Sequence, residues 1–192
     1  EFMLNEQEVI DRAKAEKPDI LIFSNPCNPG GQGFDHGEAV RICMALEDTL
    51  VVVDEAYMDF WDQSILDCST ALENVLVMKT LSKAFGCAAM RCGFIIGYKD
   101  LIDQLNKTRS PYNINTMTQL AACIVLEDTS WQKEQCKQLI ARKEELEAAC
   151  QKLAEKYGVF TVLPTHTNFA VLRTEKCTEI FEEMKKRSIC VR

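Results

Sequence analysis

Short apolar runs alternate with amphipathic segments through the first half of the chain. The runs are rich in valine, isoleucine and leucine, which is typical of strands buried inside a parallel sheet. Apolar residues at helical spacing before the first run and between the first two predict helices there. This alternation predicts an α/β fold with a mostly parallel sheet and flanking helices. The expected strands lie side by side in one sheet and span 19–23, 50–53, 75–78 and 94–96. The runs at 75–78 and 94–96 are both expected to be interior parallel strands.

The second half of the chain begins with helical patterns and ends with a different alternation. Leucine, isoleucine and alanine recur at helical spacing among many charges over 131–157, which predicts one long helix ended by Gly158. The pattern after it predicts a β-β-α-β unit over 159–163, 168–172, 178–186 and 189–191. We therefore expect part of a large domain at 1–130, a connecting helix at 131–157 and part of a smaller α/β domain at 158–192.

Composition and charge remove several classes of function. The net charge of −7 over 192 residues argues against broad binding to nucleic acid. No apolar run approaches the roughly 18 residues that a membrane span requires. The ten cysteines include no C-x-x-C pair and lie within apolar runs, which favours a reducing cytosol, with Cys87 and Cys92 as small core residues. His36 and His166 are the only histidines, so a structural zinc site has little support.

A lysine with hydroxyl neighbours follows the third expected strand. Lys83 comes shortly after Thr80 and Ser82, and Arg91 follows eight residues later. Residues just past the carboxyl end of a strand lie where open α/β sheets bind ligands. A lysine can form a Schiff base with a carbonyl cofactor, and hydroxyls with a guanidinium suit a phosphate, which together describes pyridoxal phosphate. The alternative interpretation is a helix N-cap followed by a solvated lysine.

Two other strand ends carry polar residues. Asp54 follows the strand at 50–53, where it is either a helix N-cap or a carboxylate that faces a pyridine nitrogen and keeps it protonated. The first strand runs into a turn at 24–31 that contains two Asn-Pro steps and paired glycines. Such a rigid turn holds the amide of Asn28 still, as a ligand contact requires.

The motifs SNPCNPGG, VVVDEAYMDF, TLSKAFGCAAMRCGF, SPYNIN and TNFAVLR, in this order, resemble those of fold-type I pyridoxal-phosphate aminotransferases. They are most similar to histidinol-phosphate aminotransferases, through nearly the whole chain. The resemblance implies that Lys83 forms the Schiff base and shuttles the proton, and that Asp54 pairs with the ring nitrogen. It also implies the remaining contacts: the ring 3-oxygen with Asn28 and Tyr57, the cofactor phosphate with Thr80, Ser82 and Arg91, and the substrate phosphate with Arg192.

The chain departs from the family in one turn and in length. Gly30 stands where the family usually has threonine in N-P-T-G, which is expected to loosen the turn without removing Asn28. The family's enzymes have a long amino-terminal portion, with an aromatic ring that stacks on the pyridine, and they continue beyond the position of Arg192. We therefore expect a fragment of a longer protein.

The function implied for the parent protein is transfer of an amino group between L-histidinol phosphate and 2-oxoglutarate in histidine biosynthesis, by a cytoplasmic homodimer. Two alternatives stay open: a decarboxylase similar to those that act on threonine phosphate, and an inactive α/β interaction fragment. The isolated chain is expected to bind little pyridoxal phosphate, to lack aminotransferase activity and to associate through unpaired strand edges.

Overall fold

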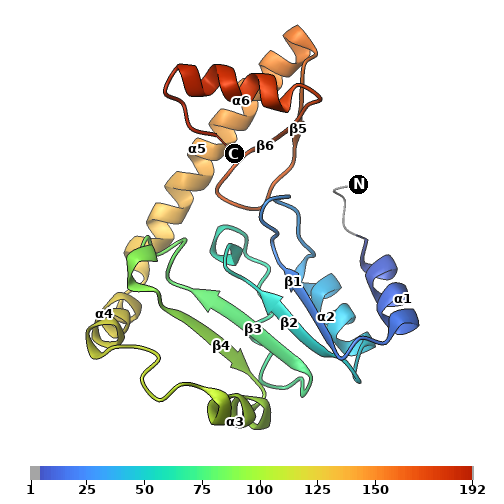
Figure 1. Ribbon diagram of the computed structural model, residues 1–192, viewed down its shortest axis with the longest axis vertical. Coiled ribbons are helices and arrows are strands. Elements are labelled where there is room, and N and C mark those ends of the chain that lie inside the picture. Colours follow the sequence, from blue (N-terminus) through green and yellow to red (C-terminus); the bar gives the residue numbers. More distant parts are fainter. Residues whose placement is uncertain (1–4, 192) are drawn as a thin grey trace.

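The computed structural model describes residues 5–191, in which a layered α/β unit is joined by a long helix to a smaller group of elements (Figure 1). Arg192, for which a substrate contact was expected, lies outside the described residues. The elements in chain order are α1 (Glu6–Glu16), β1 (Ile20–Ser24), α2 (His36–Ala45), β2 (Leu50–Asp54), the 3-10 turn η1 (Met58–Phe60), β3 (Val75–Thr80), the 3-10 turn η2 (Ala88–Met90), β4 (Gly93–Gly97), α3 (Lys99–Thr108), α4 (Thr116–Glu127), α5 (Ser130–Tyr157), β5 (Thr161–Leu163), β6 (Val171–Arg173) and α6 (Cys177–Lys186).

The main sheet has the strand order β1-β2-β3-β4, and the predicted α/β fold with a mostly parallel sheet is confirmed. Strands β1 to β3 are parallel, with Ser24 beside Asp54 and Asp54 beside Met78. Strand β4 is antiparallel to β3, so the expectation of a second interior parallel strand at 94–96 was wrong. A parallel return normally needs a crossover helix, whereas only the short turn η2 lies between β3 and β4.

One face of the sheet packs against α1 and α2 and forms the main hydrophobic core. Valines of β2 and β3 alternate onto this face, where they meet Ile42 and its neighbours on α2. Four of these valines, Val51, Val53, Val75 and Val77, are fully buried. Burial of each stabilises the fold by about 1.5–3 kcal/mol, so this layer sets which face of each strand turns inward.

The two helices of this layer begin at side-chain caps. The side chain of Asn5 accepts a hydrogen bond from the backbone of Glu8 at 3.1 Å. Asp35 and Glu38 form a reciprocal capping box at the start of α2. These caps set where α1 and α2 begin, in the two segments where the apolar spacing predicted helices.

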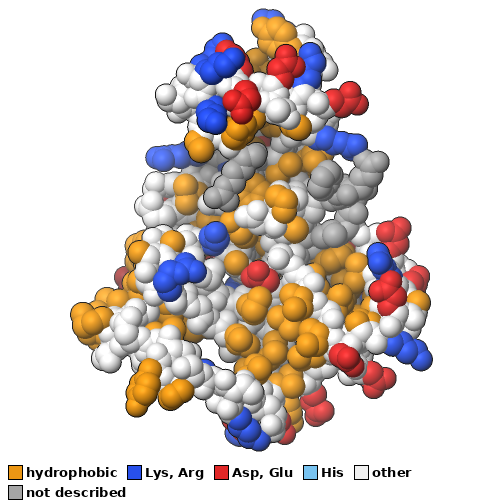
Figure 2. Space-filling model, viewed as in Figure 1, with side chains coloured by type: hydrophobic (Ala, Val, Ile, Leu, Met, Phe, Trp, Pro, Cys, Tyr) orange, Lys and Arg blue, Asp and Glu red, His pale blue; other side chains and the backbone are white. Residues whose placement is uncertain are grey.

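The opposite face of the sheet is open over β1 and β4. Ile20, Ile22 and Ile95 expose 52%, 64% and 50% of their surface. Figure 2 shows hydrophobic side chains gathered over the sheet on the face turned toward the viewer. In the pairing register Asp54 lies beside Met78, which lies beside Ile95, so the candidate cofactor carboxylate belongs to the open face.

The long helix α5 leads from the sheet to a small unit made of β5, β6 and α6 (Figure 1). Strands β5 and β6 pair antiparallel. Residues 189–191 pair with neither β5 nor β6, so the predicted third strand is absent from the described residues. Ser188 adopts the left-handed conformation and the Ile189 N–H bonds to the Met184 carbonyl at 2.9 Å, which is a Schellman ending. The division of the chain at 130 and 157 stays a prediction.

Across residues 5–191, no helix combines the length and the apolar character needed to cross a membrane.

The open sheet face leads to a prediction about association. Replacing Ile22 with lysine places a charge among exposed apolar side chains, and we expect self-association to weaken by about tenfold or more. Analytical ultracentrifugation over a concentration series measures this change. Met44→Lys is the control, because Met44 is also exposed, at 56%, but lies on α2. Equal association of the wild type and the Ile22 variant would contradict the prediction.

Candidate functional site

The candidate site lies where β1, β2 and β3 end. These three strands are parallel, so their carboxyl ends meet at one edge of the sheet. The chain leaves β1 through a turn that reaches Phe34, leaves β2 at Asp54, and leaves β3 at Thr80. Ligands bind at this edge in open α/β sheets, and it carries every described residue that the sequence nominated.

The turn after β1 is fixed by a buried asparagine. The side chain of Asn25 accepts from Phe34 N at 2.7 Å and donates to the Phe34 carbonyl at 3.0 Å. Backbone hydrogen bonds of 2.7 Å join Cys27 to Gln32 and Gly31 to Cys27. These contacts make the turn rigid around the exposed Asn28.

The two adjacent glycines of this turn have different constraints. A Cβ at Gly30 would meet nothing within 4 Å, so a side chain would fit there, and the expected loosening of the turn stays a prediction. Gly31 has φ +74°, and a Cβ there would lie 2.5 Å from the Thr165 side chain. The chain from β5 to β6 therefore packs directly on this glycine.

Three of the nominated residues come together. The Asn28 amide donates to the Tyr57 hydroxyl oxygen at 2.6 Å. The ammonium of Lys83 lies 5.0 Å from the centre of the Tyr57 ring, within cation–π range. Phe169 meets the same ring edge-on, with 5.6 Å between ring centres. Tyr57 is thus the point at which the ends of β1 and β3 and the small unit converge.

Asp54 does not act as a helix N-cap. Its carboxylate accepts from the Ala56 N–H at 3.0 Å, which closes a local turn. The next helical segment, η1, follows Tyr57 and has no side-chain cap. The carboxylate keeps further acceptor positions for a ligand, since each ionised oxygen accepts more than one hydrogen bond. No ion pair joins Asp54 to Lys83 among the described contacts.

The residues nominated for a phosphate are close in the chain but are engaged in local hydrogen bonds. The Thr80 hydroxyl donates to the Cys92 carbonyl at 3.4 Å and accepts from the Ser82 N–H at 3.1 Å. The exposed Arg91 donates to the Ala88 carbonyl at 3.0 Å. Arg91 has φ +51°, in the left-handed region, where it ends the 3-10 turn η2. Cys92 is buried as expected, while Cys87 is half-buried.

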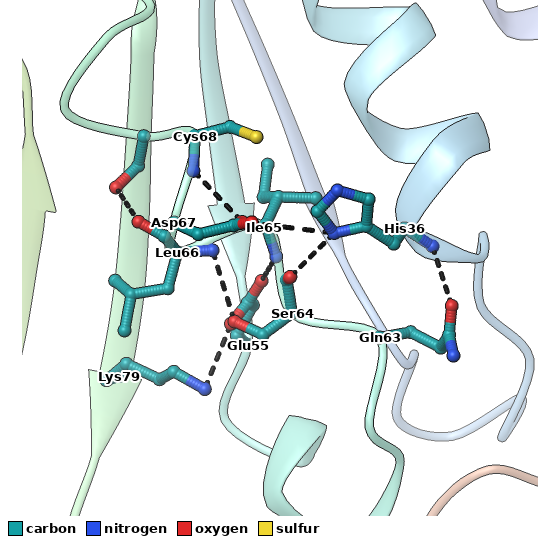
Figure 3. A network of polar contacts seen from close by, with 10 residues as sticks. His36, Glu55, Gln63, Ser64, Ile65, Leu66, Asp67, Cys68 and Lys79 are labelled. Atoms are coloured by element: carbon teal, nitrogen blue, oxygen red, sulfur yellow. Dashed lines mark hydrogen bonds and ion pairs between the residues drawn. The ribbon is translucent and has the colours of Figure 1, made fainter.

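Sequence reasoning missed a buried ion pair beside Asp54 (Figure 3). Glu55 is fully buried, and its carboxylate lies 2.9 Å from the Lys79 ammonium. The same carboxylate accepts from the Ser64 hydroxyl at 2.5 Å and from the Ile65 N–H at 2.9 Å. The pair joins β3 and the loop 63–68 to the end of β2. An acid within D-E-A-Y was visible in the sequence, but its partners lie too far along the chain to be inferred.

Burial also shifts the pKa of a carboxyl group near this ion pair, that of Asp59. Desolvation raises the pKa of the Asp59 carboxyl above its ordinary value, and the Lys79 ammonium partly opposes this shift.

A second missed contact lies at the other side of the site, where His166 stacks on Trp61 with 3.8 Å between ring centres. Desolvation, and then the nearby Lys143 ammonium, lower the pKa of His166. The neutral imidazole is therefore favoured in this stack.

Comparison with known proteins identifies the class of enzyme that has this fold, the pyridoxal-phosphate-dependent aminotransferases. The model of the aminotransferase class I and II family matches residues 5–192. The chain belongs to this family.

Curated relatives of this chain include histidinol-phosphate aminotransferases. The protein from Clostridium novyi is 35% identical over 192 residues, which is all of this chain and 52% of the relative. The protein from Ruminiclostridium cellulolyticum is 32% identical over 191 residues, again 52% of its length. The chain thus spans about half the length of the curated relatives it matches.

Solved structures share the fold. Histidinol-phosphate aminotransferase from Sinorhizobium meliloti, in complex with pyridoxal-5'-phosphate, has a TM-score of 0.87 at 24% identity and covers 100% of this chain and 53% of its own. L-threonine-O-3-phosphate decarboxylase from Porphyromonas gingivalis has a TM-score of 0.82 at 22% identity and covers 98% of this chain and 58% of its own. At these identities the likeness establishes the fold alone.

The Glu55–Lys79 pair gives a stability prediction. Glu55→Gln keeps the volume but removes the charge that three groups bind, so the free energy of unfolding should fall by about 1.5–3 kcal/mol. Urea unfolding measures this loss when the slope of the free energy against urea concentration is the same in the variant and the wild type. Glu16→Gln removes the exposed Arg12–Glu16 pair and should change stability by less than about 1 kcal/mol. Equal losses in both variants would show that the buried pair contributes no more to stability than the exposed pair.

Proposed function

We propose that this chain binds pyridoxal 5'-phosphate at the carboxyl ends of β1 to β3 and carries the catalytic lysine of an aminotransferase. The observation that carries the proposal is the convergence of Asn28, Tyr57 and Lys83 beside the end of β2. A primary amine, two hydrogen-bonding groups for one oxygen and a nearby carboxylate are the donor set that this cofactor requires. The Sinorhizobium meliloti enzyme, whose fold this chain shares, was solved with the same cofactor bound.

The residues present fit the cofactor in different degrees. The Asn28 amide and the Tyr57 hydroxyl already meet at 2.6 Å, so both are in place to donate to one ring oxygen beside them. Asp54 keeps free acceptor capacity for a protonated ring nitrogen. Thr80, Ser82 and Arg91 would hold the phosphate after giving up local hydrogen bonds. When bound, pyridoxal phosphate supplies a conjugated ring that withdraws electrons from the bond broken at the substrate α-carbon.

The chain's own residues would perform three tasks in this chemistry. The Asp54 carboxylate holds the proton on the ring nitrogen, an electrostatic contribution of the kind that dominates many enzymes. The Nζ atom of Lys83 would take the proton from the substrate α-carbon and return it to the adjoining carbon of the cofactor. Tyr57 and Asn28 fix the ring so that the amine and the carbon meet in the required geometry.

For the substrates we propose L-histidinol phosphate and 2-oxoglutarate, as in histidine biosynthesis. The support is that relatives above 30% identity, which this chain matches over its full length, carry the name histidinol-phosphate aminotransferase. Arg192 remains the candidate for the substrate phosphate. We also propose a cytoplasmic homodimer, with small-molecule partners and neither nucleic acid nor membrane. The net charge of −7 supports the exclusion of nucleic acid.

A second candidate is decarboxylation of threonine phosphate. The structure from Porphyromonas gingivalis, named as an L-threonine-O-3-phosphate decarboxylase, covers 98% of this chain at a TM-score of 0.82. The two reactions share a lysine and a carboxylate, so the fold does not separate them. The curated relatives favour the aminotransferase.

The function and the lysine are tested together in the full-length gene product that contains these residues. Borohydride reduction with pyridoxal phosphate should label Lys83 and leave Lys79 unlabelled, because Lys79 is paired with Glu55 at 2.9 Å. Glutamate should form from histidinol phosphate and 2-oxoglutarate, and Lys83→Ala should lower kcat by at least about 10²-fold.

Lys107→Ala is the matched control, since Lys107 lies on α3, away from the sheet edge, and should retain normal kcat. Label on Lys79 in place of Lys83 would overturn the assignment of the lysine. Carbon dioxide release from threonine phosphate without glutamate formation would establish the second candidate and overturn the first.

A further inference from the structure

Three side chains of metal-binding type lie together on the side of the molecule that carries α2, outside the cofactor site (Figure 3). They are His36, the first residue of α2, and Asp67 and Cys68 in the loop 63–68. One ligand atom from each, a ring nitrogen, a carboxylate oxygen and a sulfur, lies within 4.8 Å of the other two. Nitrogen, sulfur and carboxylate oxygen at such spacing are the ligands that zinc takes in tetrahedral sites.

The histidine is already oriented by its surroundings. Its Nδ1 atom lies 2.9 Å from the Ser64 carbonyl oxygen, which can only accept, so Nδ1 carries the proton. The lone pair of the neutral ring is then on Nε2. Metal-binding histidines commonly donate their other ring N–H to a carbonyl in this way, which fixes the tautomer and raises the basicity of the ligand.

The loop and the helix are held in place by contacts of which all but one, to the Asp67 carboxylate, leave the candidate ligand atoms unused. The backbone N–H of His36 donates to the Gln63 side chain at 3.0 Å. Ser64 and Ile65 are anchored on the buried Glu55. Asp67 accepts from the Cys68 N–H at 3.0 Å, which brings the two loop residues into one local turn. The scaffold of the cluster therefore does not depend on a bound ion.

Charge balance is compatible with a divalent cation here. The electropositive amino end of α2 disfavours a cation, but two negative ligands offset this effect. On binding, Cys68 releases its thiol proton to solvent, so that a thiolate and the Asp67 carboxylate together neutralise a divalent ion. The three side chains are half-buried or exposed, which leaves an entry path and a fourth position for water.

We propose that His36, Asp67 and Cys68 form a zinc-binding site, with a ring nitrogen, a carboxylate oxygen and Sγ as ligands. The bound ion joins the start of α2 to the loop that carries the partners of Glu55, and so stabilises the fold at the end of β2. This site is independent of the proposed aminotransferase function, because none of its residues belongs to the cofactor set.

The test uses the 192-residue chain with Zn²⁺ alone, followed by calorimetry and by X-ray absorption of the bound metal. We expect one tight equivalent, with about 2.3 Å to one sulfur and about 2.0 Å to nitrogen and oxygen. Cys68→Ser and Asp67→Asn should each weaken binding by at least about tenfold, because even the loss of an outer-shell partner has an effect of this size. Zn²⁺ should also raise the Tm of the wild type and not that of Cys68→Ser.

The nine other cysteines require a control. Cys123 and Cys177 are exposed, so the double variant Cys123→Ser/Cys177→Ser should keep the tight equivalent. His166→Gln should keep it as well, which separates His36 from the other histidine. Absence of tight binding by the wild type, or binding that survives Cys68→Ser but is lost in the double variant, would overturn the proposal.

Discussion

The parallel register of β1, β2 and β3 is the constraint on which the rest of this structure depends. It places Ser24 beside Asp54 and Asp54 beside Met78. Successive side chains of a strand point to opposite faces, so a slip of one residue would exchange Asp54 and Glu55. The register is held by the fully buried valines beneath the sheet and by the Glu55–Lys79 pair at its end. One carboxylate therefore stabilises the fold while its neighbour stays available at the site.

Tyr57 connects this register to the segments around it. Its hydroxyl receives the Asn28 amide, its ring faces Lys83, and Phe169 from the small unit packs against its edge. Gly31 and Thr165 make the same connection through backbone packing. The small unit thus contributes to the position of the site although it lies at the far end of α5 in the sequence. Opening this contact would move the chain at Gly31 and Phe169 relative to Tyr57.

Sequence patterns predicted much of this arrangement because local signals carried it. Apolar runs identified β1 to β3, although β1 proved only partly buried, and polar residues at their ends identified Asp54 and Lys83 as candidates for one edge. Strand β4 was predicted, but its direction was wrong, because an apolar run does not encode direction, which depends on whether the connection contains a helix. The strand predicted at 189–191 is absent because an apolar run forms a strand only where a neighbouring strand can pair with it, and the described residues pair β5 only with β6. The Glu55–Lys79 pair and the cluster at His36 depend on partners distant in sequence.

The most direct test of the account is to map pyridoxal phosphate on the isotope-labelled chain by NMR. We predict weak, saturable binding, because Asn28, Lys83 and Arg91 are all exposed. The shifted signals should be confined to residues 54–57, residues 80–83 and the Asn28 side chain, and Lys83→Ala should remove them. Shifts centred on the basic end of α6, with none at the ends of β2 and β3, would contradict the account.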